Sequence, residues 1–221
     1  MCYICRPSNG SFRKLKLTET LGNEKNNLKT KNMLSEISKF FKTEYPLNDH
    51  GLEELFSLFR IDNYDKGSLI LKADTKEKKL RFLTKGIVRE YYANQEKEIN
   101  INFYVKPQFI SDLLSFSQNS TTRKNQECLT DIQMLSIERD SYFDLLEKYE
   151  CGKSFVDSSF KKLLKQKEML EFNRTTKTPE ELYKELCIYK PEWLQLIPQY
   201  HIASYINVTP ETLSRIRKRI S

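Results

Sequence analysis

This sequence of 221 residues has little of what many enzymes and metal proteins need. It contains only two His, and no glycine-rich phosphate loop, HExxH or GxSxG motif is present. Two His provide few zinc ligands and few groups for acid–base catalysis. We therefore predict that the chain is not an enzyme, and we expect no catalytic residue, no metal and no cofactor.

Long apolar runs are also missing. No segment approaches the roughly 20 apolar residues that a membrane-spanning helix requires, and the N-terminal residues lack the apolar stretch of a signal peptide. Five Cys is an odd and low number, which does not suggest a framework of disulfides. These absences predict a cytoplasmic protein with no membrane partner.

The net charge of +7 is unevenly distributed. Residues 1–32 contain seven basic and two acidic residues, and residues 199–221 contain four basic residues and one acidic residue. The long middle of the chain is therefore close to neutral. Residues 1–32 are polar and without periodicity, so we expect a disordered basic extension there. We further hypothesise that these residues lie upstream of the native start, with Met33 as the first translated residue.

Alternating apolar residues dominate the next part of the chain. After a short helix predicted over 48–59, period-two patterns occur over 68–71, 80–84, 87–92, 99–104 and 129–137. Several short strands separated by turn signals indicate an antiparallel sandwich or barrel. We therefore predict one β domain over residues 33–150.

Helical spacing returns beyond this region. Within residues 151–175 an apolar seam steps by four and three residues, which predicts one long helix of about 24 residues suited to dimerisation. This seam contains one charged member and consists of Val156, Phe160, Leu163, Lys167 and Leu170. A simpler interpretation is that the seam packs on the chain's own β domain, and the sequence does not choose between the two. A polar break near residue 175 separates this helix from the last domain, residues 176–221.

The strongest functional signal lies in residues 197–220. Residues 198–206 predict a short helix, Asn207 suits a positive φ at a turn, and Thr209 with Pro210 suits the start of a second helix. Leu213, Ile216 and Ile220 give that second helix one apolar face. This arrangement predicts a helix-turn-helix whose second helix, residues 209–220, enters the major groove of double-stranded DNA.

The polar face of the second helix has chemistry that suits DNA. An Arg can form two hydrogen bonds with guanine, a Glu can accept from cytosine, and hydroxyl and amino groups suit phosphate oxygens. A solvated basic helix is the plainer alternative. The residues that we predict to bind DNA are Gln199, Thr209, Pro210, Glu211, Thr212, Ser214, Arg215, Arg217 and Lys218.

With these motifs in view, residues 34–221 resemble the Crp/Fnr superfamily of bacterial transcription regulators, in particular its effector-poor branch. The stretch from Thr209 to Ile216 is similar to the family's recognition-helix signature. The resemblance implies an α+β fold: an N-terminal β-roll of the cyclic-nucleotide-binding (jelly-roll) type, a long dimerisation helix and a C-terminal winged helix-turn-helix. It also implies a homodimer on a palindromic operator and a contact with RNA polymerase.

The sequence departs from the family where effectors bind. The segment that matches the family's ribose and phosphate motif has Ser111 and Asp112 for Gly-Glu, and Arg123 lies one place off the expected Arg. Asp112 and Arg123 define a candidate effector pocket of weakened kind, and a surface acid with a solvated Arg is the alternative. Cys2 and Cys5 form a lone CxxC pair, so we expect no iron–sulfur cluster. An effector-gated sensor, taking a small anion such as a cyclic nucleotide, is the second functional hypothesis.

Overall fold

The computed structural model describes residues 37, 47–150 and 152–220. The expected extension over residues 1–32 and the CxxC pair lie outside these residues. The first half of the described chain contains α3 (Asp49–Leu58), β1 (Arg60–Tyr64), β2 (Leu69–Leu71), β3 (Lys79–Lys85), β4 (Val88–Ala93), β5 (Glu98–Tyr104) and β6 (Gln108–Phe109). It continues with α4 (Leu113–Gln118), β7 (Asn125–Cys128), β8 (Ile132–Glu138) and α5 (Arg139–Lys148).

The strands form two antiparallel four-stranded sheets, as the alternating patterns predict. One sheet has the order β1-β8-β3-β6 and the other β2-β7-β4-β5. Leu83, Val88, Ile110 and Met134 are buried together in one cluster that draws on both sheets. The predicted antiparallel β-roll is therefore confirmed, and β5 forms one edge of its sheet.

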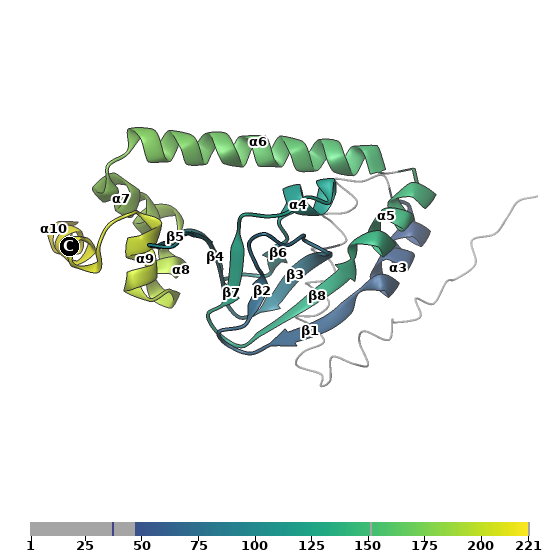
Figure 1. The fold of residues 1–221 in the computed structure, drawn as a ribbon, viewed down its shortest axis with the longest axis horizontal. Coiled ribbons are helices and arrows are strands. Elements are labelled where there is room, and N and C mark those ends of the chain that lie inside the picture. Colours follow the sequence, from purple (N-terminus) through teal and green to yellow (C-terminus); the bar gives the residue numbers. More distant parts are fainter. Residues whose placement is uncertain (1–36, 38–46, 151, 221) are drawn as a thin grey trace, which may run out of the picture.

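Helices α3 and α5 cover the first sheet at one end of the roll (Figure 1). The predicted helix over 48–59 is confirmed, because the Asn48 side chain accepts the Gly51 N–H at 2.8 Å and caps α3. Leu52 and Leu55 face inward from α3, and Leu145 and Leu146 face inward from α5. Their burial fixes the helices onto the roll.

Helix α6 (Gly152–Thr176) has 25 residues, so the single long helix is confirmed. It runs along one side of the molecule, over the β-roll (Figure 1). It contacts α4 and α5. At 1.5 Å per residue its length is about 37 Å, which carries the chain from one end of the roll to the other.

The last domain consists of α7 (Pro179–Tyr189), α8 (Pro191–Leu196), α9 (Gln199–Tyr205) and α10 (Pro210–Ile220). A capping box of Thr178 and Glu181 begins α7. No strand follows α6 in the part of the chain that the structure describes, so a wing is not seen among these residues. Pro191 starts an additional helix, α8, immediately after α7, in a stretch for which the sequence analysis predicted no element.

Candidate DNA-binding surface

Helices α9 and α10 form the predicted helix-turn-helix. Asn207 has a φ of 57°, as its position at the turn requires. The Val208 N–H donates to the Ala203 carbonyl at 2.9 Å, and Ala203 is fully buried where the two helices meet. The Thr209 hydroxyl accepts the Thr212 N–H at 3.3 Å and caps α10. The small residue, the turn and the cap thus act together to set the angle between the helices.

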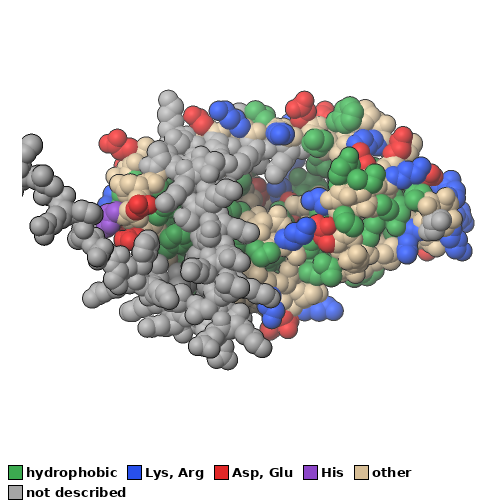
Figure 2. Space-filling view, turned by 180° about the vertical axis from the view of Figure 1, so that it is seen from behind, with side chains coloured by type: hydrophobic (Ala, Val, Ile, Leu, Met, Phe, Trp, Pro, Cys, Tyr) green, Lys and Arg blue, Asp and Glu red, His purple; other side chains and the backbone are tan. Residues whose placement is uncertain are grey.

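The exposed side of α10 is a strip of polar side chains. Leu213 and Ile216 are buried on its inner side, at 1% and 2% exposure. On the opposite side, positions i, i+3, i+4 and i+7 are all exposed. We call these four residues the outer face of α10; they are Glu211, Ser214, Arg215 and Lys218. Figure 2 shows Lys and Arg side chains gathered at the end of the molecule that α10 forms.

Glu211 has a defined position on this outer face. Its own backbone N–H and the Thr209 hydroxyl donate hydrogen bonds to its carboxylate, and with the charge of Arg215 they lower the pKa of Glu211 below its ordinary value. The carboxylate is therefore an acceptor at neutral pH. Next to it, Arg215 is an exposed donor, and such a pair can discriminate between base edges.

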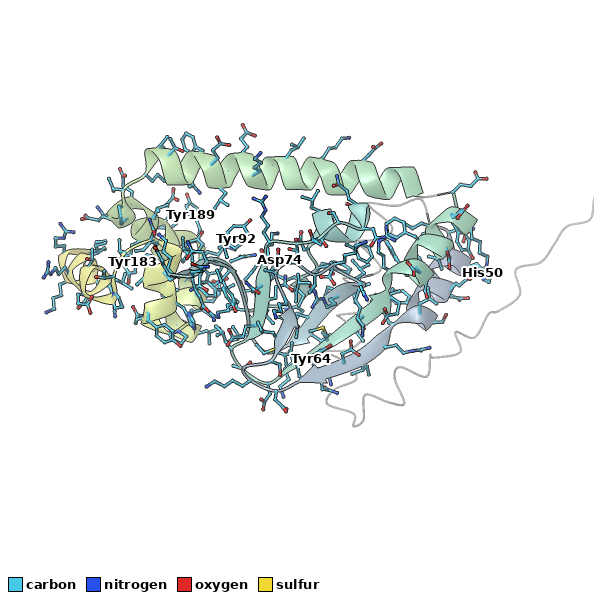
Figure 3. All side chains as sticks on the ribbon, in the orientation of Figure 1. His50, Tyr64, Asp74, Tyr92, Tyr183 and Tyr189 are labelled. Atoms are coloured by element: carbon cyan, nitrogen blue, oxygen red, sulfur yellow. The ribbon has the colours of Figure 1, made fainter. Side chains whose placement is uncertain are left out.

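Two other basic residues of α10 are turned toward α7 instead of the outer face. Arg219 forms an ion pair of 3.2 Å with Glu180. Arg217, which the sequence analysis assigned to DNA, hydrogen-bonds with Tyr183, a buried residue of α7. Figure 3 labels Tyr183 beside the helix-turn-helix. The helix thus divides its four cations between outer-face residues and residues that join α10 to α7.

The remaining residues predicted to bind DNA lie at the two helix starts. Gln199 is half-buried as the first residue of α9. Thr209 and Pro210 are exposed at the start of α10, whereas Thr212 is half-buried with its hydroxyl 3.2 Å from that of Thr209. These residues lie beside the outer face, and their role in DNA binding stays a prediction.

The residues that we predict to mediate dimerisation lie on α6. The side chains of Val156, Phe160 and Leu163 fall outside the described side chains, Lys167 is exposed and Leu170 is half-buried. Other apolar side chains of α6 are more than half exposed, namely Leu164, Met169 and Phe172. Exposed apolar residues along one helix are unfavourable in water unless another surface covers them.

A buried polar network occupies the β-roll where the effector pocket was expected. Asp112, only 5% exposed, accepts a hydrogen bond of 2.5 Å from the Thr122 hydroxyl. The Lys124 ammonium lies 3.5 Å from Asp112 Oδ1 and also 3.5 Å from Glu90 Oε1. Arg123 is exposed, so the structure does not bring the predicted pair of Asp112 and Arg123 together.

Further side chains of the roll complete this network. Glu90 accepts hydrogen bonds from Tyr104 at 3.0 Å and from Gln126 at 2.7 Å. Burial disfavours the charged form of Lys124, but Glu90 and Asp112 outweigh that effect and raise the pKa of this amine. Arg81 is buried in an ion pair with Glu77. Both cations of the network are therefore already neutralised by carboxylates of the same chain.

The chain thus joins a β-roll through one long helix to a helix-turn-helix. The family model of the cyclic nucleotide-binding domain matches residues 61–149, which extend from β1 to the end of α5. A search of curated protein sequences finds no match.

Several solved structures share this fold. A transcriptional regulator of the Crp/Fnr family from Eubacterium rectale has a TM-score of 0.61 at 14% identity, over 79% of this chain and 84% of that chain. FixK2 from Bradyrhizobium japonicum has a TM-score of 0.58 at 16% identity, over 73% and 84%. A CooA mutant from Carboxydothermus hydrogenoformans has a TM-score of 0.57 at 16% identity, over 75% and 78%. This chain thus has the fold of these regulators.

The residues of the β-roll do not fit a cyclic nucleotide. A cyclic phosphate is an anion and needs unpaired donors, preferably cationic ones. Here Lys124 and Arg81 are paired with acids, and the buried Asp112 and Glu90 would repel a phosphate. The matched domain therefore retains the family's fold while its polar interior is closed by its own side chains.

None of the helices in residues 47–150 and 152–220 is long and apolar enough to cross a membrane. Those residues also include no group of three or more His, Cys, Asp or Glu side chains placed to hold a metal ion.

Proposed function

We propose that this chain is a cytoplasmic transcription regulator that binds a palindromic DNA operator as a homodimer. The observation that carries the proposal is the outer face of α10. Its four residues are exposed together on the second helix of a helix-turn-helix, at one end of the molecule. A helix in this position reads the major groove with its outward side chains.

Each outer-face residue has a chemical role in this proposal. Arg215 donates two hydrogen bonds to the edge of a guanine, and Glu211 accepts from the amino group of a cytosine. Ser214 and Lys218 bind phosphate oxygens and hold the helix in register. The resemblance to the Crp/Fnr superfamily aligns Pro210 with an Arg that reads guanine in well-studied members, so we expect a different half-site for this protein.

Dimerisation through α6 supports the palindromic operator. The helix lies along the outside of the β-roll with Leu164, Met169 and Phe172 exposed. A second α6 packed in parallel along the predicted seam would relate two α10 helices by a two-fold axis. Contact of this dimer with RNA polymerase is a further prediction that the family resemblance supports.

An effector-gated sensor is the weaker alternative. It requires an anion site in the β-roll, and the buried network around Lys124 opposes one. We therefore propose a regulator that binds its operator without a cyclic nucleotide.

The test is selection of DNA by the purified full-length chain. The protein is incubated with fragmented genomic DNA of its source organism, and the bound fragments are sequenced and footprinted. We expect one palindromic motif with half-site centres about 10 base pairs, or a multiple of that, apart. A variant with Glu211→Ala and Arg215→Ala keeps the buried side of α10 and should lose the motif. Recovery of random fragments by the unaltered protein would refute the proposal.

A further inference from the structure

The free edge of strand β5 faces the DNA-binding domain. Because β5 is the last strand of its sheet, its outward N–H and C=O groups need partners from elsewhere. The Ser204 hydroxyl of α9 accepts the Asn100 N–H at 3.0 Å and donates to the Glu98 carbonyl at 2.9 Å. One side chain of the helix-turn-helix thus satisfies two backbone groups of the β-roll.

Asn100 strengthens this junction from the side of the roll. Its side chain is 1% exposed, and its amide nitrogen donates to the His201 carbonyl at 3.2 Å and lies 3.3 Å from His201 Nδ1. Within three residues of β5, the backbone of Glu98 and both the backbone and side chain of Asn100 are joined to α9. Such directional contacts fix the orientation of α9 relative to β5 more closely than apolar packing alone would.

The apolar core of the DNA-binding domain also includes the roll. Phe103 of β5 is 2% exposed, and its ring meets the Trp193 ring edge-on, with centroids 5.0 Å apart. Ile202 and Ala203 of α9 lie in the same buried cluster. Ile87, Val105 and Leu129, all from the roll, pack against its rim. Because residues 176–220 form no strand, β5 supplies the strand against which the helix-turn-helix packs.

We infer that β5 is a working part of the DNA-binding domain, and that Ser204 and Asn100 are positioning residues for operator recognition. They hold α9, and with it α10, at one orientation to the β-roll and to α6. In a dimer joined through α6, that orientation sets the separation of the two recognition helices. The inference rests on the proposed function, because it concerns how a palindromic operator is read.

The orientation in which α9 is held against β5, which we call docked, is the one that binds DNA. The junction uses His201 and Ser204 of α9 and Trp193 of α8, while the outer face of α10 stays exposed. Docking therefore covers none of the four outer-face residues. Free rotation of the domain about the end of α6 would instead spread the two recognition helices over many separations, and binding to two fixed half-sites would become weaker.

Ser204→Ala tests the inference with little change to the helix-turn-helix itself. Alanine is a better helix former than serine, so α9 keeps its intrinsic stability. The variant leaves the Asn100 N–H and the Glu98 carbonyl without their partner. The matched control is Ser57→Ala in α3, where an exposed serine hydroxyl donates to a carbonyl of its own helix, far from the junction.

Two measurements on the full chain are needed. Hydrogen exchange followed by mass spectrometry reports docking through the peptide that covers β5, and we expect about tenfold faster exchange there in Ser204→Ala.

Binding is measured to the whole operator and to a single half-site. We expect the whole-operator affinity to fall about tenfold while the half-site affinity stays the same, because only the separation of the helices is lost. The Ser57→Ala control should change neither quantity.

Three results would overturn the inference. Unchanged exchange of β5 would show that Ser204 does not hold the junction. Equal losses on the whole operator and the half-site would mean a structural defect of the domain, and tighter binding to the operator would mean that docking inhibits. If the unaltered protein binds no specific DNA, the proposed function fails and the positioning role fails with it. The exchange data would still decide whether the junction forms.

Discussion

The ammonium group of Lys124 lies 3.5 Å from Oδ1 of Asp112 inside the β-roll. The carboxylate that the family resemblance aligns with a ribose-binding residue therefore already has a cation of its own chain beside it. The same ammonium also lies 3.5 Å from Oε1 of Glu90. Lys124 therefore balances the charge of both carboxylates, and no charged ligand is needed to do so.

The first prediction concerns effectors. Isothermal titration of the purified protein with cyclic AMP and with cyclic GMP should show no binding at micromolar concentrations, because buried carboxylates would face the phosphate. Lys124→Met should lower the free energy of unfolding by about 2 kcal/mol, since two buried acids lose their shared partner. Saturable micromolar binding of either nucleotide would contradict the closed interior that we describe.

The second prediction separates the outer face of α10 from its flank. Arg215→Ala should cost roughly 1–3 kcal/mol of operator affinity and relax the preference at one base pair. Arg219→Ala removes an equal charge from the same helix, but Arg219 is paired with Glu180, so base preference should stay the same. Selection from a randomised half-site library measures both. Uniform weakening of Arg215→Ala across all sequences would assign Arg215 to phosphate instead.

The third prediction concerns phosphate contacts. In the homodimer, Lys218→Ala should make the dependence of log affinity on log salt concentration shallower by about one unit per half-site, and so by about two units on the whole operator, because one fewer counterion is released at each half-site. Fluorescence anisotropy with labelled operator between low and moderate salt measures this slope. Arg217→Ala is the comparison: Arg217 is bonded to Tyr183, so its slope should change less. An unaltered slope in Lys218→Ala would exclude its phosphate role.

The fourth prediction uses the single tryptophan of the chain as a probe of docking. Trp193 is 3% exposed and its ring meets the Phe103 ring edge-on, so its emission reports the junction between β5 and the C-terminal helices. In urea, the red shift of Trp193 should coincide with the loss of β-sheet circular dichroism, because both regions share one core. Phe103→Ala should lower the free energy of unfolding by about 3–5 kcal/mol. It should also shift the Trp193 emission to the red in the absence of urea. Separate transitions in the unaltered protein would show that the two domains unfold independently.

The fifth prediction is a pH dependence of the same junction. Burial, together with the positive charge of Arg89, lowers the pKa of His201 from 6.5 to about 4, although Glu98 opposes the shift. The unfolded chain therefore binds a proton at His201 between pH 6.5 and 4 that the folded chain does not bind. Stability should fall as the pH falls through this window. Urea titrations at pH 7 and pH 5, followed by Trp193 emission, should show the loss, and His201→Gln should show a smaller one.

The sequence analysis located most elements because their signals are local. The cap of α3, the positive φ of Asn207 and the Thr209 cap all depend on residues within a few positions of one another. The short strands β1, β6 and β7 were not found. β6 has only two residues. The pattern of β7, Asn125–Cys128, is polar because Gln126 hydrogen-bonds with Glu90, Glu127 pairs with Arg89 and Asn125 accepts the Ala73 N–H, so apolar alternation is missing.

The site was predicted in part for the same reason. Helical spacing identifies the outer face of α10, since residues at i, i+3, i+4 and i+7 share one side of any helix. It could not show that Arg217 and Arg219 are directed to α7, because both are equally basic in sequence. The pairing partners Tyr183 and Glu180 are more than 30 residues away, and only the packing of α7 under α10 brings them close.

By itself the sequence determined the local units of this protein: a β-roll, one long helix, and a helix-turn-helix with a polar outer face. Periodicity, caps and turns act over a few residues, so they can be read from the chain. Only the tertiary structure decided that Lys124 closes the roll's polar interior and that α9 covers the edge of β5. The second contact joins residues 104 positions apart, Asn100 and Ser204. An edge strand exposes backbone N–H and C=O groups that every sequence has, so its residues do not predict which segment will cover it.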